Sequence, residues 1–200
     1  MTRIEDALLA AQLGADAIGV VLTARSRRRV SLEQARAIVR AMPPFVATVA
    51  LLMDDEAAFV NEVIECVQPS LLQFHGTETD AWCAQFGRPY LKAVPMGEGA
   101  AALPRLRHHP QAAALLLDGH GLGEPGGSGK AFDWALMPAA LAQPLILAGG
   151  LDAGNVAAAI RAARPWAVDV ASGIESAPGI KDPQRMAAFI DAVRAADRAA

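Results

Sequence analysis

Short apolar runs alternate with amphipathic runs along almost the whole chain, and this alternation limits the folds that are open to it. A typical apolar run is AIGVVL at residues 17–22, which has no polar side and predicts a strand buried on both faces. Such strands belong to parallel sheets, because the crossover connections between parallel strands place helices over both faces. The chain is therefore predicted to be an α/β protein with a parallel sheet.

The order and spacing of these runs predict seven strands and eight helices. The strands are expected at residues 17–22, 45–53, 70–74, 90–94, 113–118, 144–150 and 167–173. The helices are expected after residue 2, at residues 31–42, 54–67, 78–86, 98–108, 133–141 and 152–163, and after residue 182. Units of about 25 residues repeated this often indicate a (β/α)8 TIM barrel rather than an open sheet. Because a helix comes first, the barrel is expected to lack its first strand.

Three of the predicted helices begin with capping signals. Thr2 with Glu5, and Ser31 with Gln34, match the capping box, in which each side chain bonds the backbone N–H of the other residue. Asp182 is followed by proline, which predicts an N-cap acid with proline at the first helical position. These signals place the first helix directly after the initiator methionine.

Composition and charge narrow the class of protein further. With 200 residues, 53% of them hydrophobic, the chain is expected to form one domain over residues 1–200 with a packed core. A net charge of −3 argues against nucleic acid as a partner, and the apolar runs are too short to span a membrane. Cys66 and Cys83 fall in predicted helices and are expected to be reduced thiols. Because no secretion signal begins the chain, a cytoplasmic protein is expected.

Residues at the carboxyl ends of the predicted strands are the candidates for chemistry, because βα barrels build their active sites there. Asp118 ends an otherwise apolar strand and could be a general acid or base, or a solvated loop residue. His75 also lies at the end of a predicted strand, and its side chain could make either a structural hydrogen bond or a contact with the substrate. Arg28 lies in the loop after residues 17–22, and its guanidinium could hold a substrate carboxylate or be solvated. No cluster in the sequence has metal-ligand spacing.

Glycine-bearing loops follow the last three predicted strands. Their candidate residues are Gly127, Gly129, Gly149, Gly150, Ser172 and Gly173. Such loops present backbone N–H groups to an anion, and barrels of this kind hold phosphate at the last two strands. Three of them on one rim therefore predict a phosphate site. The alternative is that the glycines serve tight turns only.

Six stretches, taken in order, resemble the phosphoribosylanthranilate isomerase family of tryptophan biosynthesis over essentially the whole chain. They read TRIEDALLAAQLGADAIGVV, SRRRVSLEQARAIV, LLQFHGTE, PGGSGKAFDW, PLILAGGLDAGNV and VDVASGIESAPGIKDP. The resemblance implies a TIM barrel that takes N-(5-phosphoribosyl)anthranilate to 1-(2-carboxyphenylamino)-1-deoxyribulose 5-phosphate by an Amadori rearrangement. It implies a phosphorylated small-molecule substrate and no metal or cofactor. A monomer or a homodimer is expected.

The resemblance also implies roles for particular residues. Asp118 matches the family's general acid, which opens the ribose ring, and Arg28 matches the arginine that meets the anthranilate carboxylate. Gly127, Gly129, Gly149, Gly150 and Gly173 match the phosphate-binding rim. A protonated carboxyl in a partly buried site can supply the proton that ring opening needs.

The chain departs from the family pattern at its start. The family begins with a strand of the form K-x-C-G-x-T-R, whose cysteine is the general base, and only Thr2-Arg3 matches its last part. Cys66 and Cys83 lie on predicted helices away from the rim, so neither is expected to replace that base. Either the start codon lies upstream of Met1, or the shortened chain is real and abstracts the C2 proton poorly. We expect the former.

Two other functions remain open from the residues alone. Another phosphate-binding barrel enzyme, such as an indole-glycerol-phosphate synthase, would want a lysine base, and Lys92 is the only lysine in a predicted strand. A non-catalytic phosphate-binding remnant would bind ligand without turnover.

Overall fold

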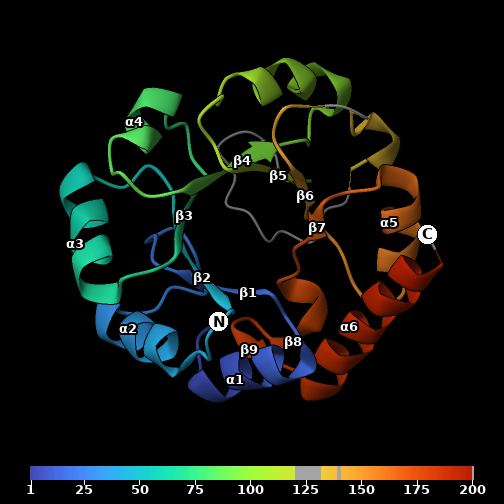
Figure 1. The fold of residues 1–200 in the computed structure, drawn as a ribbon, viewed down its shortest axis with the longest axis horizontal. Coiled ribbons are helices and arrows are strands. Elements are labelled where there is room, and N and C mark those ends of the chain that lie inside the picture. The colour runs from blue at the N-terminus through green and yellow to red at the C-terminus, as the bar shows by residue number, and fades with distance from the viewer. Residues whose placement is uncertain (120–131, 139–140, 200) are drawn as a thin grey trace.

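A single parallel sheet of seven strands forms the centre of the protein (Figure 1). This computed structural model describes residues 1–119, 132–138 and 141–199. The sheet order is β1-β2-β3-β4-β5-β6-β7, the same as the order along the chain. The strands are β1 (Ala17–Val21), β2 (Ala47–Leu52), β3 (Leu71–Phe74), β4 (Tyr90–Pro95), β5 (Ala114–Asp118), β6 (Leu145–Leu147) and β7 (Ala167–Val168). The prediction of seven parallel strands is confirmed.

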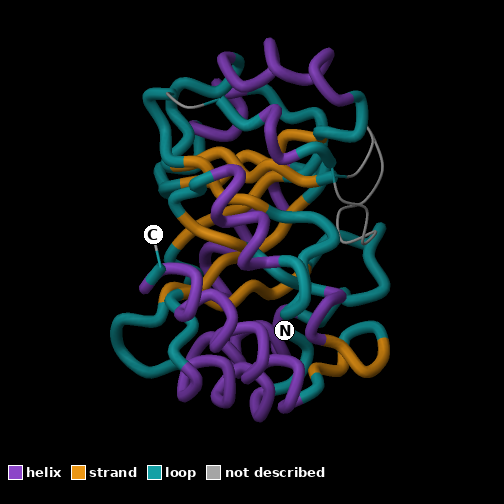
Figure 2. Tube along the Cα trace, turned by 90° about the vertical axis from the view of Figure 1, so that its right-hand side faces the viewer, coloured by secondary structure: helices purple, strands orange, loops and turns teal. Residues whose placement is uncertain are grey.

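Helices surround the curled sheet, and a small hairpin lies beside them (Figures 1 and 2). The α-helices are α1 (Ile4–Leu13), α2 (Leu32–Ala41), α3 (Ala57–Val67), α4 (Asp80–Ala84), α5 (Val156–Ala163) and α6 (Pro183–Arg198). Three 3-10 helices are η1 (Gly99–Arg107), η2 (Trp134–Leu136) and η3 (Ser172–Ile174). The antiparallel hairpin is formed by β8 (Glu175–Ala177) and β9 (Ile180–Lys181). Among the described residues, no helix is long and apolar enough to cross a membrane.

The sheet is open between β1 and β7. These strands stand at the two ends of the strand order, so within the described ranges each pairs with one neighbouring strand of the sheet only. A cavity of ≈ 460 Å³ lies there, with Ala17 and Ile18 of β1 on one side and Ala167 and Val168 of β7 on the other. An eighth parallel strand would occupy this place in a closed barrel. The expected (β/α)8 barrel without one strand is therefore confirmed.

Several predicted helix starts differ from the structure, and at two of them the polar side chain expected at the start bonds elsewhere. The N-cap of α1 is Arg3 rather than Thr2, and it has no side-chain capping bond. The hydroxyl of Thr2 instead donates to the carbonyl of Gly179, which ties the chain start to the β8–β9 hairpin. Helix α3 begins at Ala57 rather than at Asp54, because Asp54 has φ +52° and its carboxylate accepts the backbone N–H of Thr77 at 2.6 Å.

The other two capping signals act largely as predicted. Asp182 accepts from the backbone N–H groups of Gln184 and Arg185, at 2.9 and 3.0 Å. The hydroxyl of Ser31 accepts from the backbone N–H of Gln34 at 3.1 Å. The side chain of Gln34 does not complete the box, because it donates to the carbonyl of Thr2 at 2.5 Å.

Several predicted elements are shorter than expected, among them β6, α4 and α5, and three others differ more strongly. The helix at residues 98–108 is the 3-10 helix η1, which contains Pro104, a residue without the N–H that a continuing helix needs. Within the predicted helix at residues 133–141, the described part forms only η2, and residues 139–140 lie outside the described ranges. The strand predicted at residues 167–173 is the short β7, which ends at Val168, and residues 169–172 border a second cavity.

Candidate active site

A cavity of ≈ 160 Å³ lies at the carboxyl ends of the strands, where the sequence predicts the site. Of the seven predicted site residues that the structure describes, six line it: Arg28, His75, Asp118, Gly149, Gly150 and Ser172. Asp118 is the last residue of β5 and the others lie in segments after β1, β3, β6 and β7, so the curled sheet brings distant parts of the chain together. Gly127 and Gly129 lie outside the described residues.

Asp118 is the last residue of β5 and is only 4% exposed. The pairing of β4 with β5 places it beside Pro95, and its carbonyl accepts the backbone N–H of Met96 at 2.8 Å. The backbone at the end of β5 is therefore fixed while the side chain borders the cavity. A carboxyl group held in this way can exchange a proton with a bound ligand.

His75 follows β3 and is 9% exposed. Its backbone N–H donates to the carbonyl of Leu52 at 2.9 Å, which extends the pairing of β3 with β2 by one residue. The Nε2 atom of its ring is in contact with the side-chain amide of Gln73. Both side chains line the cavity, so His75 has a buried polar partner and access to a ligand at the same time.

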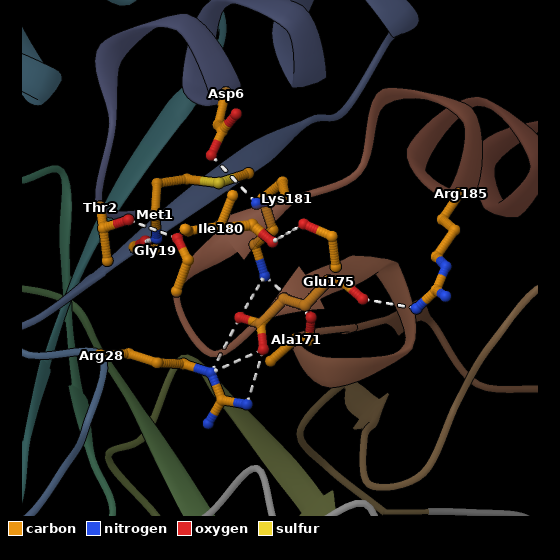
Figure 3. A network of polar contacts seen from close by, with 12 residues as sticks. Met1, Thr2, Asp6, Gly19, Arg28, Ala171, Glu175, Ile180, Lys181 and Arg185 are labelled. Atoms are coloured by element: carbon orange, nitrogen blue, oxygen red, sulfur yellow. Dashed lines mark hydrogen bonds and ion pairs between the residues drawn. The ribbon is translucent and has the colours of Figure 1, made fainter.

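Arg28 lies in the loop after β1 and pairs with Glu175 of β8 (Figure 3). Its Nε atom lies 2.8 Å from Oε1 of Glu175 and its Nη2 atom lies 2.8 Å from Oε2, a two-point contact between guanidinium and carboxylate. The hydrogen bond from Arg28 to Glu175 raises the pKa of the guanidinium, against the effect of burial. Arg28 is thus a permanent cation on the cavity wall.

The turn after β6 has a backbone that favours glycine. Gly149 and Gly150 have φ angles of +84° and +66°, a region that side chains rarely adopt. The side-chain amide of Asn155, at the start of α5, donates to the carbonyl of Gly150 at 2.8 Å and holds the turn against that helix. The positive φ angles thus explain both glycines as turn residues. Because both also line the cavity, their backbone N–H groups could in addition bind an anion.

Gly173 has a different environment. A Cβ atom built on it would lie 1.9 Å from the carbonyl oxygen of Leu151, so the loops after β6 and β7 approach each other too closely for a side chain. Its neighbour Ser172 borders the cavity. A packing requirement therefore accounts for glycine at position 173, and its predicted phosphate contact stays a prediction.

Sequence reasoning missed three charged residues on the cavity wall: Asp169, Glu175 and Lys181. Asp169 is surrounded by protein atoms but its side chain opens onto both cavities, so water reaches it and its desolvation is partial. Burial and the negative charge of Asp118 both raise the pKa of Asp169. An acid that directly follows an apolar strand is the signal that could have found Asp169, as it found Asp118.

Neither cysteine borders this cavity. Cys66 is an exposed free thiol on α3, and Cys83 is a buried free thiol on α4. Burial raises the pKa of Cys83 to about 12, so its thiol stays protonated near neutrality. The expectation that both are free thiols on helices away from the rim is confirmed, and within the described part of the chain the cavity wall holds no thiolate base.

Lys92, the candidate base of the alternative enzyme, is occupied elsewhere. Its Nζ atom lies 2.7 Å from the Glu78 carboxylate and donates to the carbonyl of Gly76 at 2.6 Å. Both charged side chains are buried, and Lys92 does not border the cavity.

The curled parallel sheet and the acidic and basic residues at its carboxyl end define a βα-barrel enzyme. A family model for N-(5'-phosphoribosyl)anthranilate isomerase matches residues 1–192. The chain therefore belongs to the N-(5'-phosphoribosyl)anthranilate isomerase family, as its resemblance implied.

Relatives with this activity in their names match almost the whole chain. The enzyme of Pseudomonas paraeruginosa is 50% identical over 198 residues, which are 99% of this chain and 94% of that protein. The enzyme of Nitrosospira multiformis is 51% identical over 193 residues, which are 96% of this chain and 93% of that protein.

Solved structures of the same family share the fold. The phosphoribosyl anthranilate isomerase of Thermus thermophilus is 40% identical with a TM-score of 0.86, and the match covers 98% of this chain and 96% of that one. The Thermotoga maritima isomerase is 37% identical with a TM-score of 0.87 and the same coverage. An isomerase solved with a reduced form of 1-(o-carboxyphenylamino)-1-deoxyribulose 5-phosphate is 34% identical, has a TM-score of 0.80 and matches 98% of this chain and 95% of that one.

Proposed function

We propose that the cavity at the carboxyl ends of the strands is where this isomerase rearranges N-(5-phosphoribosyl)anthranilate into 1-(2-carboxyphenylamino)-1-deoxyribulose 5-phosphate. The observation that carries the proposal is the gathering of Asp118, Arg28 and the turn at Gly149 and Gly150 on the wall of one cavity. These groups are suited to an acid step, a carboxylate and a phosphate respectively.

In this proposal, Asp118 is the general acid. Its carboxyl group gives a proton to the ring oxygen of the ribose as the bond from C1 to that oxygen breaks, which leaves a Schiff base between C1 and the anthranilate nitrogen. Loss of the C2 proton then gives an enolamine, which becomes the ketone product by proton transfer to C1. The ring carboxylate faces Arg28, His75 contacts the substrate, and the phosphate lies at Gly149, Gly150, Ser172 and Gly173, with Gly127 and Gly129 as further candidates.

Removal of the C2 proton needs a base, and the described part of the cavity wall offers no cysteine for this step. That observation favours a second candidate function, a barrel that binds phosphorylated ligand without efficient turnover. Both candidates act on a small phosphorylated molecule in the cytoplasm, without metal or cofactor. One solved relative is described as dimeric, and we infer a monomer or a homodimer for this chain, which sedimentation would assign.

Substitution of Asp118 tests the proposal. Asp118→Asn should lower turnover by about 10²–10⁴-fold, the usual contribution of a general acid, while calorimetric binding of the reduced product stays within a few-fold of wild type. Asp191→Asn, on the exposed face of α6, is the matched control and should leave both unchanged. Binding without measurable wild-type turnover would support the second candidate. Absence of binding by the wild-type chain would contradict both.

A further inference from the structure

The pairing of Arg28 with Glu175 has a consequence for how the cavity would recognise its ligand. Glu175 is 147 residues away from Arg28 in the sequence, and its side chain is only 5% exposed. It uses both carboxylate oxygens on the Nε and Nη2 edge of the guanidinium. The Nη1 atom lies on the other side of the guanidinium, away from Glu175 (Figure 3).

Glu175 is itself held from several directions. The ammonium of Lys181 lies 3.1 Å from its Oε1 atom and also donates to the carbonyl of Ala171 at 2.8 Å. The guanidinium of Arg185, on α6, donates to the backbone carbonyl of Glu175. The backbone N–H of Lys181 donates to the carboxylate of Asp6 at 3.1 Å, so the hairpin is anchored to α1 as well.

The charges make Glu175 a permanent anion between two cations. Burial alone would raise the pKa of Glu175, but the hydrogen bond from Arg28 and the charge of Lys181 outweigh it and hold that pKa below its ordinary value. Arg28 and Lys181 carry two positive charges around the one negative charge of Glu175, and Asp118 and Asp169 also lie on the cavity wall. Arg28 lacks freedom to turn, because two hydrogen bonds fix the plane of its guanidinium.

We infer that Glu175 is a positioning residue, which holds the guanidinium of Arg28 in the orientation that binds an aryl carboxylate. Glu175 thereby determines how strongly the cavity prefers a ligand that carries this group. This inference rests on the proposed function of Arg28. A guanidinium already fixed on one edge presents its remaining N–H groups without a further loss of side-chain freedom when the carboxylate arrives. Lys181 supports this arrangement by holding Oε1 of Glu175.

Two ligands measure the effect directly. The first is the reduced product, which carries the ring carboxylate, and the second is the same compound with the carboxylate replaced by hydrogen. Wild type should bind the first at least 10-fold more tightly. In Glu175→Gln this preference should fall about 10-fold, since the amide no longer pairs with Arg28 as an anion, while binding of the second ligand changes less than twofold. Glu175→Asp, which keeps the charge, should recover part of the preference.

The control variants separate positioning from a structural role. Glu98→Gln breaks an arginine–carboxylate pair with Arg105 that lies outside the cavity wall and should leave the preference unchanged. In an Arg28→Ala background, Glu175→Gln should have no further effect on the preference. If Glu175→Gln weakens both ligands equally, or fails to fold while Glu175→Asp leaves the preference at the wild-type value, the inference is wrong.

The outcomes also separate this inference from the proposed function. A wild-type chain that binds neither ligand would overturn the proposed function and the inference with it. A wild-type chain that binds both ligands equally would overturn the carboxylate-binding role of Arg28, and the inference with it, but not the rest of the proposed function. A wild-type preference that survives Glu175→Gln would overturn only the role of Glu175.

Discussion

At the scale of single residues, two carboxyl groups share one cavity wall. Asp118 ends β5, and Asp169 directly follows β7. Only the curvature of the sheet brings them onto the same cavity. Because burial and the charge of Asp118 both disfavour the ionised form of Asp169, the titration of Asp169 is expected to depend on the charge of Asp118.

Removal of one carboxylate should change the titration of the other. In Asp118→Asn, the repulsion is gone and the ionised form of Asp169 becomes easier to form, so the pKa of Asp169 should fall towards its ordinary value. Carbon-13 NMR of the Asp169 carboxyl, assigned with Asp169→Asn, measures this. A titration midpoint that stays in place or rises would contradict the prediction, and Asp191→Asn should have no effect.

The two thiols should differ strongly in reactivity. Cys66 is exposed, whereas burial raises the pKa of Cys83 to about 12 and keeps it from forming a thiolate. At pH 8, iodoacetamide should modify Cys66 and leave Cys83 intact in the native protein. Mass spectrometry of the modified peptides checks this, with Cys66→Ser as the control that should show no rapid modification. Equal labelling of both sites would be the contrary result.

At the scale of secondary-structure elements, the caps show where local sequence is sufficient. Asp182 caps α6 with two hydrogen bonds, as its sequence pattern predicts. Thr2 and Asp54 have residue types that favour caps, but both side chains bond to distant loops, at Gly179 and Thr77. A capping side chain has more than one possible partner, and tertiary contacts choose among them.

The cap on α6 should have a measurable effect on stability. Asp182→Ala removes both hydrogen bonds to the first turn and should lower the free energy of unfolding by about 1 kcal/mol. Glu56→Ala is the matched control, because Glu56 is the N-cap of α3 and makes no side-chain capping bond. Urea unfolding of both variants measures the difference. Equal effects would show that the capping bonds of Asp182 contribute nothing.

At the scale of the whole molecule, the opening between β1 and β7 is the dominant feature. The cavity there is lined on the inside by apolar residues of the sheet, including Val49, Leu91 and Leu116. Unpaired strand edges and uncovered apolar side chains both favour an additional extended segment.

An engineered extension should stabilise the fold by filling this cavity. Five residues of alternating apolar character joined ahead of Met1 should pair with β1 and β7 and bury about two or three side chains. We expect a rise in Tm of the order of 5 °C. A glycine–serine extension of the same length is the control, and an equal Tm for both chains would contradict the prediction.

Much of the fold and part of the site follow from the sequence. The apolar runs define the strands because both faces of a parallel sheet are buried, so each strand carries its own signal. Arg28, His75 and Asp118 could be found because each follows or ends such a run, and a barrel places those positions on one cavity.

Only the tertiary structure decided which side chains meet. The partner of Arg28 is 147 residues away, and nothing in the local pattern around Glu175 indicates that contact. Gly173 is required by the carbonyl of Leu151 in another loop, and Asp169 is opposed by Asp118 from a different strand. The spacing of apolar residues along the chain indicates which residues are buried, and this spacing can be read from neighbouring positions. Pairing of charges and close backbone approach depend on how the sheet curls, which the whole chain determines together.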